Sequence, residues 1–127
     1  MHKTFSHNVK IYYEDTDSGG VVYYANYLKY FERARTEALS TIGISNLKIK
    51  DEFNSLIIVK SCNIEYKKSA YLEDNLTIKS FISSFSKTSF VMDQSIYRYN
   101  LLIVDAKIHL VFVDTIGKPI KLSLIHI

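Results

Sequence analysis

The chain has 127 residues, of which 47% are hydrophobic, and it contains only four glycines and one proline. This length and composition predict a single domain over residues 1–127 with its own core, and they exclude a disordered or low-complexity chain. The formal net charge of +3 comes from lysines spread along the sequence, a pattern typical of a solvated surface that gives little support to a nucleic-acid-binding protein.

A single cysteine, Cys62, excludes an intrachain disulfide and is typical of a protein from a reducing compartment. Residues 1–7 lack the apolar core of a signal peptide, and no run of apolar residues approaches the roughly 18 that span a bilayer. These features predict a cytoplasmic protein without a transmembrane segment. Because Cys62 lies within an apolar stretch, we expect a small buried side chain rather than a nucleophile.

The first elements of the chain are predicted to be a strand and a long helix. Loose alternation of apolar and polar residues over Phe5 to Tyr13 predicts the strand. The helix is expected from Tyr24 to Ile42, with Gly43 as its C-terminal stop. At 100° per residue its apolar side chains share one face, which should pack on the core. These side chains are Tyr24, Leu28, Phe31, Ala38, Leu39 and Ile42.

Arg35 lies near the middle of this apolar face. A guanidinium cannot be left there without a partner, because burying an unpaired charge strongly destabilises the folded state. The candidate carboxylates are Asp15 and Glu14, in the loop before the helix. We therefore expect Arg35 to link the helix to this loop rather than to contact a ligand.

The rest of the chain is expected to form strands after a polar connection from Lys50 to Asn54. It is rich in β-branched and aromatic residues, which favour strands. One helix followed by antiparallel strands predicts an α+β protein, with one long central helix and a sheet of five to six strands. The predicted strands are Leu56 to Lys67, Asn75 to Phe85, Ser89 to Tyr99 and Leu101 to Asp114, and Lys118 to Ile127 could add a last one.

The strand from Leu101 to Asp114 has two apolar faces. Its even-numbered face, from Leu102 to Phe112, alternates cleanly and should cover the helix. Its odd-numbered face also carries apolar residues, and one helix covers only part of a sheet, so apolar surface should be left over. These residues are Leu101, Ile103, Val111 and Val113. We therefore expect a homodimer at least, with a homotetramer as the larger alternative.

The stretch from Tyr12 to Tyr27 combines acidic residues, two glycines and the first turn of the helix. Gly19 and Gly20 allow the backbone to turn sharply, and the first N–H groups of a helix have no intrahelical partners. These groups and the helix dipole favour negative charge, such as the oxyanion that forms when a thioester carbonyl is attacked. Asp17 is then a candidate base or nucleophile, and the pattern predicts an acyl-transfer site.

Simpler interpretations of this loop exist. Asp17 could do no more than form an Asx turn, which is a common role of Asp before Gly, and the residues alone do not decide between a turn and catalysis. A calcium loop is disfavoured, because Gly19 and Asn26 stand where such a loop needs a liganding side chain and a bidentate Glu. The four histidines lack metal-ligand spacing, so neither a metal site nor a cofactor is expected.

The motifs of the chain carry a family resemblance. The run from Glu14 to Tyr23 (EDTDSGGVVY), followed by Asn26-Tyr27-Leu28 and by Phe31 to Arg35 (FERAR), closely resembles the YbgC/4-hydroxybenzoyl-CoA thioesterase family of hotdog-fold proteins. The resemblance extends to Ser61-Cys62-Asn63, to 74–78 (DNLTI) and to 87–90 (KTSF), so it covers nearly the whole chain. It implies a hotdog fold, acyl-CoA thioesterase activity and an active site at a subunit interface.

The resemblance also implies residue roles. It assigns catalysis to Asp17 and polarisation of the carbonyl to the backbone N–H groups of Tyr24 and Ala25. YbgC-type members usually carry His at the position of Tyr24, whereas 4-hydroxybenzoyl-CoA thioesterase-like members carry Tyr, so the Tyr24 hydroxyl could instead orient the nucleophile or bind substrate. Contacts with the acyl group and coenzyme A are expected from Val22, Tyr27, Val59, Ser61, Lys87, Thr88 and Ser89.

Three classes of function remain. The first is a thioesterase that hydrolyses acyl-CoA, or an acyl group carried on acyl-carrier protein. The second is a hotdog dehydratase, which is disfavoured because no His lies in the loop or the helix. The third is a protein that binds acyl-CoA without turnover, or a scaffold of the Tol-Pal envelope system, with which YbgC-type proteins are associated.

Overall fold

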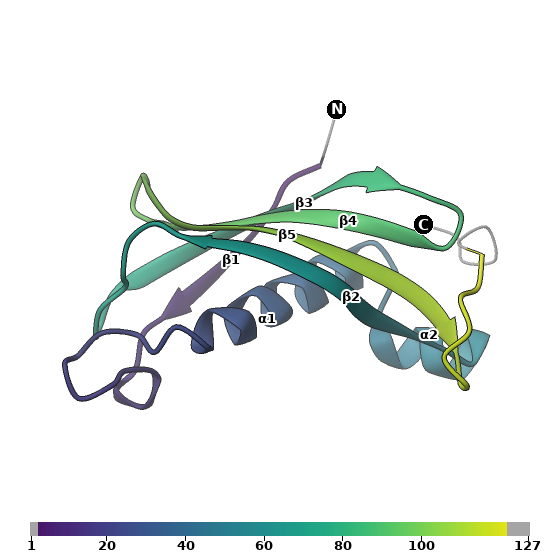
Figure 1. Ribbon diagram of the computed structural model, residues 1–127, viewed down its shortest axis with the longest axis horizontal. Coiled ribbons are helices and arrows are strands. Elements are labelled where there is room, and N and C mark those ends of the chain that lie inside the picture. Colours follow the sequence, from purple (N-terminus) through teal and green to yellow (C-terminus); the bar gives the residue numbers. More distant parts are fainter. Residues whose placement is uncertain (1–2, 122–127) are drawn as a thin grey trace.

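A computed structural model describes residues 3–121 and shows a sheet curved around one long helix (Figure 1). The strands lie in the order β1-β3-β4-β5-β2, and all neighbours pair antiparallel. The expected α+β hotdog arrangement is confirmed. The elements are β1 (Phe5–Lys10), a 3₁₀ turn (Tyr13–Asp15), α1 (Asn26–Thr41), α2 (Asn46–Phe53), β2 (Ser55–Tyr66), β3 (Asn75–Phe85), β4 (Ser89–Arg98) and β5 (Leu101–Asp114).

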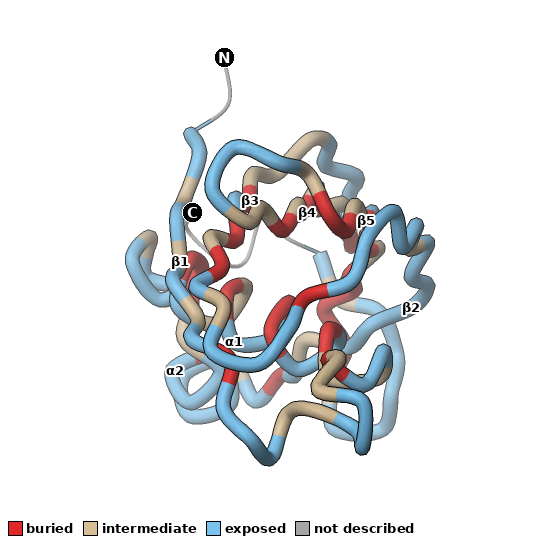
Figure 2. Tube along the Cα trace, turned by 90° about the vertical axis from the view of Figure 1, so that its left-hand side faces the viewer, coloured by how far each residue is buried: buried red, intermediate tan, exposed pale blue. Residues whose placement is uncertain are grey.

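The core lies between α1 and the concave face of the sheet, where the buried segments face one another (Figure 2). The prediction of the buried helix face was wrong for Tyr24 and Leu28, which are 61% and 48% exposed. Tyr24 contacts Tyr66 near the end of the edge strand β2, and Leu28 follows it by one helical turn, so both lie under an open edge of the sheet. The side chains that α1 buries are Tyr27, Tyr30, Phe31, Ala34, Ala38 and Leu39.

Arg35 links α1 to the sheet through a neutral partner. Its Nη1 donates to Oε1 of Gln94, a fully buried residue of β4, at 3.1 Å. The prediction of Asp15 or Glu14 as the partner was wrong, because these residues lie beside the start of α1, and Arg35 is about 13 Å further along the helix at 1.5 Å per residue. Burial lowers the pKa of the guanidinium.

Some element boundaries differ from the predictions. β1 ends at Lys10 rather than Tyr13, because the chain then enters the 3₁₀ turn. The polar connection expected near Asn54 is instead the end of α2, a helix that was not predicted. Ser45 caps this helix by accepting a backbone hydrogen bond at 3.0 Å, and Asn54 ends it with a φ of 51°. Ile49 is its one buried residue, so the sequence shows almost no helical periodicity there.

β5 buries apolar side chains on both of its faces. Of its odd-numbered residues that were expected to leave apolar surface, Ile103, Val111 and Val113 are at most 8% exposed, so the expectation was wrong for them, whereas Leu101 is 43% exposed. β5 is an interior strand between β4 and β2, and the segment after it folds back so that Pro119 forms a bridge with Val113. Most of the predicted last strand, Lys118 to Ile127, lies outside the described residues.

Several exposed apolar side chains lie on β2, which forms one edge of the sheet. Leu56, Ile58 and Val59 are each 44–48% exposed. Cys62 is exposed as well, because an edge strand is covered on one side only. The prediction of a buried thiol was therefore wrong. A bulge between Val59 and Ser61 interrupts the strand. Across residues 3–121, no helix has the length and apolarity needed to cross a bilayer.

Candidate active site

The chain between β1 and α1 forms a small hairpin, seen as the dark purple loops at the left of Figure 1. Thr16 forms a bridge with Val22, and the Asp17 N–H donates to the carbonyl of Val21 at 2.9 Å. The turn closes where the Gly20 N–H donates to the carbonyl of Asp17 at 3.1 Å. Gly20 has a φ of 76°, which glycine adopts without strain. The predicted sharp turn is therefore present.

Asp15 ties the base of this hairpin to the start of α1. Its carbonyl oxygen accepts from the Tyr23 N–H at 3.1 Å and from Asn26 Nδ2 at 2.8 Å. Its carboxylate Oδ2 accepts from the Tyr12 N–H at 2.9 Å. Because Asp17 follows two residues later, these bonds hold it close to the beginning of the helix.

The Asp17 side chain is exposed and uses one oxygen for local structure. Its Oδ1 accepts from the Gly19 N–H at 2.9 Å, which is the Asx turn considered above. Within residues 3–121, Oδ2 makes no hydrogen bond and faces solvent. An ionised carboxylate has about four acceptor positions, so the turn leaves enough capacity for a base or a nucleophile.

The helix that follows begins without a side-chain cap. Asn26 and the next two N–H groups donate to carbonyls three residues earlier. In the described part of the chain, the N–H groups of Tyr24 and Ala25 have no acceptor. They lie at the positive end of the helix dipole, where free N–H groups favour an anion. The structure thus presents two unused donors at the base of the hairpin whose turn carries an exposed carboxylate.

Aromatic side chains lie beside these donors. The ring of Tyr24 is 5.0 Å from that of Tyr23 and 6.1 Å from that of Tyr66, measured between centroids. Partial burial raises the pKa of the Tyr66 hydroxyl. The sequence motifs did not indicate Tyr66, although the alternation along its strand could have placed it on the helix-facing side. The exposed rings give the site an apolar, polarisable rim.

Two residues that the resemblance places near the substrate are buried here: Val22 lies in the second arm of the hairpin, and Tyr27 in the first turn of α1. They are 4% and 3% exposed. The Val22 N–H donates to the carbonyl of Ala70, and the Tyr27 hydroxyl accepts from the Ala70 N–H, both at 2.9 Å. Burial raises the pKa of Tyr27. Both residues therefore support the site by fixing the segment between β2 and β3.

Val59 and Ser61 lie on β2 on the two sides of its bulge. Val59 helps to line a shallow hollow of about 160 Å³ between β2 and α1, together with Glu32 and Arg35. Ser61 is exposed and aligned with His109 of β5. The two residues therefore lie along the open edge of the sheet.

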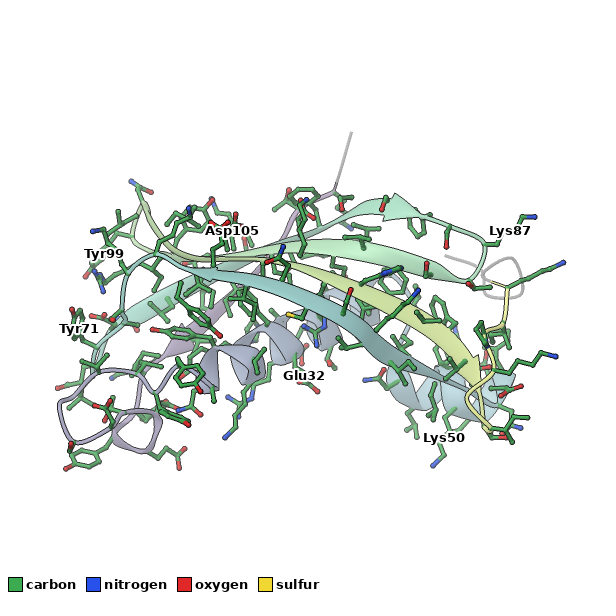
Figure 3. All side chains as sticks on the ribbon, viewed as in Figure 1. Glu32, Lys50, Tyr71, Lys87, Tyr99 and Asp105 are labelled. Carbon is green, nitrogen blue, oxygen red and sulfur yellow. The ribbon has the colours of Figure 1, made fainter. Side chains whose placement is uncertain are left out.

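The turn that carries Lys87, Thr88 and Ser89 lies at the end of the molecule opposite the hairpin (Figure 3). The Ser86 N–H donates to the carbonyl of Ser89 at 2.8 Å and closes the turn. The Ser89 hydroxyl is also 2.9 Å from Nε2 of His109, a contact that the sequence did not indicate. Lys87 points into solvent. A single chain therefore does not bring this turn to Asp17.

Comparison with known proteins shows which family the chain belongs to. A family model described as the thioesterase-like superfamily matches residues 12–123. A protein named acyl-CoA thioesterase YbgC from Haemophilus influenzae is 39% identical over 114 residues, which cover 90% of this chain and 83% of that protein.

Solved structures share the same fold. A probable thioesterase from Bartonella henselae has a TM-score of 0.89 at 32% identity, covering 94% of this chain and 98% of that one. The 4-hydroxybenzoyl-CoA thioesterase of Pseudomonas sp. strain CBS-3 has a TM-score of 0.88 at 24% identity, with 94% and 93% covered. The chain belongs to the thioesterase-like superfamily, and its resemblance to the YbgC/4-hydroxybenzoyl-CoA thioesterase family is confirmed.

Proposed function

We propose that this protein hydrolyses the thioester of acyl-CoA to a free acid and coenzyme A thiol. The observation that carries this proposal is the hairpin, which carries the exposed Asp17 carboxylate and leads directly into the uncapped start of α1. The names of the YbgC-type relatives support the same reaction.

In this proposal, the N–H groups of Tyr24 and Ala25 form the oxyanion hole. As the carbonyl is attacked, its oxygen gains negative charge, and each fixed donor lowers the barrier by about 2.7–4 kcal/mol when it is aimed at that charge. Asp17 either activates a water molecule as a general base or attacks the carbonyl itself and forms an anhydride that water then hydrolyses. Both routes consume one water and release the thiol.

The function is tested by measuring free thiol release from short, long and aromatic acyl-CoAs, and from one acyl group carried on acyl-carrier protein. We expect repeated turnover with at least one acyl-CoA. The exposed rings of Tyr23, Tyr24 and Tyr66 are positioned to contact the acyl group, so the preferred chain should be sensitive to them. Binding of acyl-CoA without thiol release would instead identify a binding or scaffold protein.

We further propose that the active site is completed by a second copy of the chain. The Lys87 turn carries a cation, hydroxyls and backbone donors that suit the phosphates of coenzyme A. Because this turn lies far from Asp17 within one chain, a second chain has to supply it. The open edge of β2 and its exposed apolar side chains offer a surface for such a contact. A cytoplasmic location is proposed from the lone Cys62.

The assembly is expected to be a homodimer or homotetramer at micromolar concentration. Sedimentation velocity measures it directly, and a dimer or tetramer is the expected species. A charged residue placed on the β2 edge, as in Ile58→Lys, should shift the distribution towards monomer, whereas Lys50→Glu on the exposed side of α2 should not. A monomer in the unaltered protein would contradict the shared site.

Lys87→Ala is expected to raise KM for acyl-CoA several-fold with little change in kcat. The lysine would contribute the same attraction to substrate and transition state, and the loss of such uniform binding appears in KM alone. Initial rates over a range of acyl-CoA concentrations give both constants. Lys118→Ala, which removes another exposed lysine, is the matched control. An unchanged KM in Lys87→Ala would reject the contact.

A further inference from the structure

Tyr30 carries a buried hydroxyl that the mechanism above does not use. Its side chain is 1% exposed, and within residues 3–121 its Oη has no hydrogen-bond partner. Buried polar groups are nearly always hydrogen-bonded, because removing them from water without a new partner destabilises the folded state. A tyrosine retained at the centre of the buried face of α1, where phenylalanine would fit, therefore calls for a partner or a role.

The fold places this hydroxyl under Asp15. Tyr30 follows Asn26 by four residues, so both lie on one face of α1, and the Asn26 amide already donates to the carbonyl of Asp15 at 2.8 Å. Aromatic side chains on a helix lean towards its N-terminus, so the hydroxyl of Tyr30 points back to the same residue. Burial and, after it, the negative charge of the Asp15 carboxylate raise the pKa of Tyr30. The hydroxyl is close enough to the carboxylate for a hydrogen bond to add to this pKa shift, although the geometry of the pair falls short of a formed hydrogen bond.

Asp15 connects Tyr30 to the active site, so a small movement of the hairpin base at Asp15 would change the active-site geometry. Its carbonyl accepts from the Tyr23 N–H, which directly precedes the oxyanion donors, and the hairpin arm that carries Asp17 begins two residues later. A change in the tilt of the hairpin base therefore alters the distance between the Asp17 carboxylate and the free N–H groups of the helix.

We propose that Tyr30 is a positioning residue, whose hydroxyl donates to the Asp15 carboxylate as the hairpin base closes on α1. This bond satisfies the buried hydroxyl only in the closed arrangement and so favours the arrangement in which Asp17 faces the oxyanion donors. The inference rests on the proposed function for its kinetic part, and on the hairpin geometry alone for the rest.

The kinetic test uses Tyr30→Phe, which keeps the ring and removes the hydroxyl. We expect kcat to fall by about tenfold, the effect of one lost hydrogen bond to a charged group, with KM within about twofold of the unaltered protein. The matched control is Tyr97→Phe, which removes a tyrosine hydroxyl from β4 beside Lys79, away from the hairpin, and should leave both constants unchanged.

A double-variant comparison tests whether Tyr30 acts through Asp15. In the Asp15→Asn background, Tyr30→Phe should lower kcat by much less than in the unaltered protein, because the charged acceptor is already gone. An equal loss in the two backgrounds would overturn the proposed link, since the hydroxyl would then act elsewhere.

Amide hydrogen exchange separates this inference from the proposed function. The N–H groups of Asp17 and Tyr23 close the hairpin and its base, so they should exchange faster in Tyr30→Phe than in Tyr97→Phe, whether or not the protein turns over acyl-CoA. Unchanged exchange together with a raised melting temperature in Tyr30→Phe would show that the hydroxyl only destabilises the fold, and would overturn the proposal. Absence of thiol release by the unaltered protein would count against the proposed function alone.

Discussion

Asp17→Asn is expected to lower kcat for acyl-CoA by about 10²–10⁴-fold while KM changes little. Asparagine has nearly the same shape and can still accept from the Gly19 N–H, so the Asx turn and the hairpin should persist. What it removes is the negative charge and the basicity of the free carboxylate oxygen. Thiol release at saturating acyl-CoA measures the loss, and an unchanged melting temperature shows that the fold is retained.

Ser18→Ala provides the matched control, because Ser18 is the exposed neighbour of Asp17 in the same turn. This variant should retain full activity. If Asp17→Asn were equally active, the hairpin would not be the catalytic element. A single turnover in heavy-oxygen water then tests for the anhydride, since label that enters the Asp17 carboxylate requires it. Label found only in the product acid is expected both for an activated water and for an anhydride that water opens at its acyl carbon.

The second large effect concerns stability rather than catalysis. Gln94→Leu is expected to lower the free energy of unfolding by roughly 2–4 kcal/mol, because it leaves the half-buried Arg35 guanidinium without its amide partner. The same substitution removes the bonds that the Gln94 amide nitrogen donates, at 3.0 Å each, to the carbonyl of Phe31 and the hydroxyl of Ser80. Urea unfolding with an unchanged m-value measures the loss.

Combining Gln94→Leu with Arg35→Met should restore part of this loss. Replacing both partners of a buried polar pair by apolar side chains of similar size is often nearly neutral, whereas removing one partner is not. Activity should be little affected in the double variant, since neither residue belongs to the hairpin. A double variant no more stable than Gln94→Leu would show that the stranded charge is not the source of the effect.

The local sequence pattern was sufficient to predict most of the strands and the hairpin that carries Asp17. Asn75–Phe85 and Leu101–Asp114 have the boundaries predicted for them, because period-two alternation ends at recognisable turn residues. The hairpin could also be located, since its acidic residues, its glycines and the helix start are contiguous in the sequence. The Asp17 environment is therefore mostly a product of near neighbours along the chain.

Features that depend on distant residues could not be read from the sequence. The exposure of Cys62 depends on β2 being an edge strand, which follows from pairing across the whole sheet order. The partner of Arg35 comes from β4, 59 positions further along the chain. Tyr66 and His109 reach the aromatic rim and the Lys87 turn in the same way, and neither belongs to a motif that marks its role.

The uncapped start of α1 sets stability and activity against each other. A side-chain oxygen that accepts from the free N–H groups of Tyr24 and Ala25 would stabilise the helix start by about 0.5–1.5 kcal/mol, the net effect of one hydrogen bond. The same oxygen would occupy the donors that the oxyanion needs, so a protein selected only for heat resistance should acquire a cap and lose turnover. The unsatisfied helix end is then a stability deficit that bound acyl-CoA relieves, and the melting temperature should rise as ligand fills the position that a cap would otherwise take.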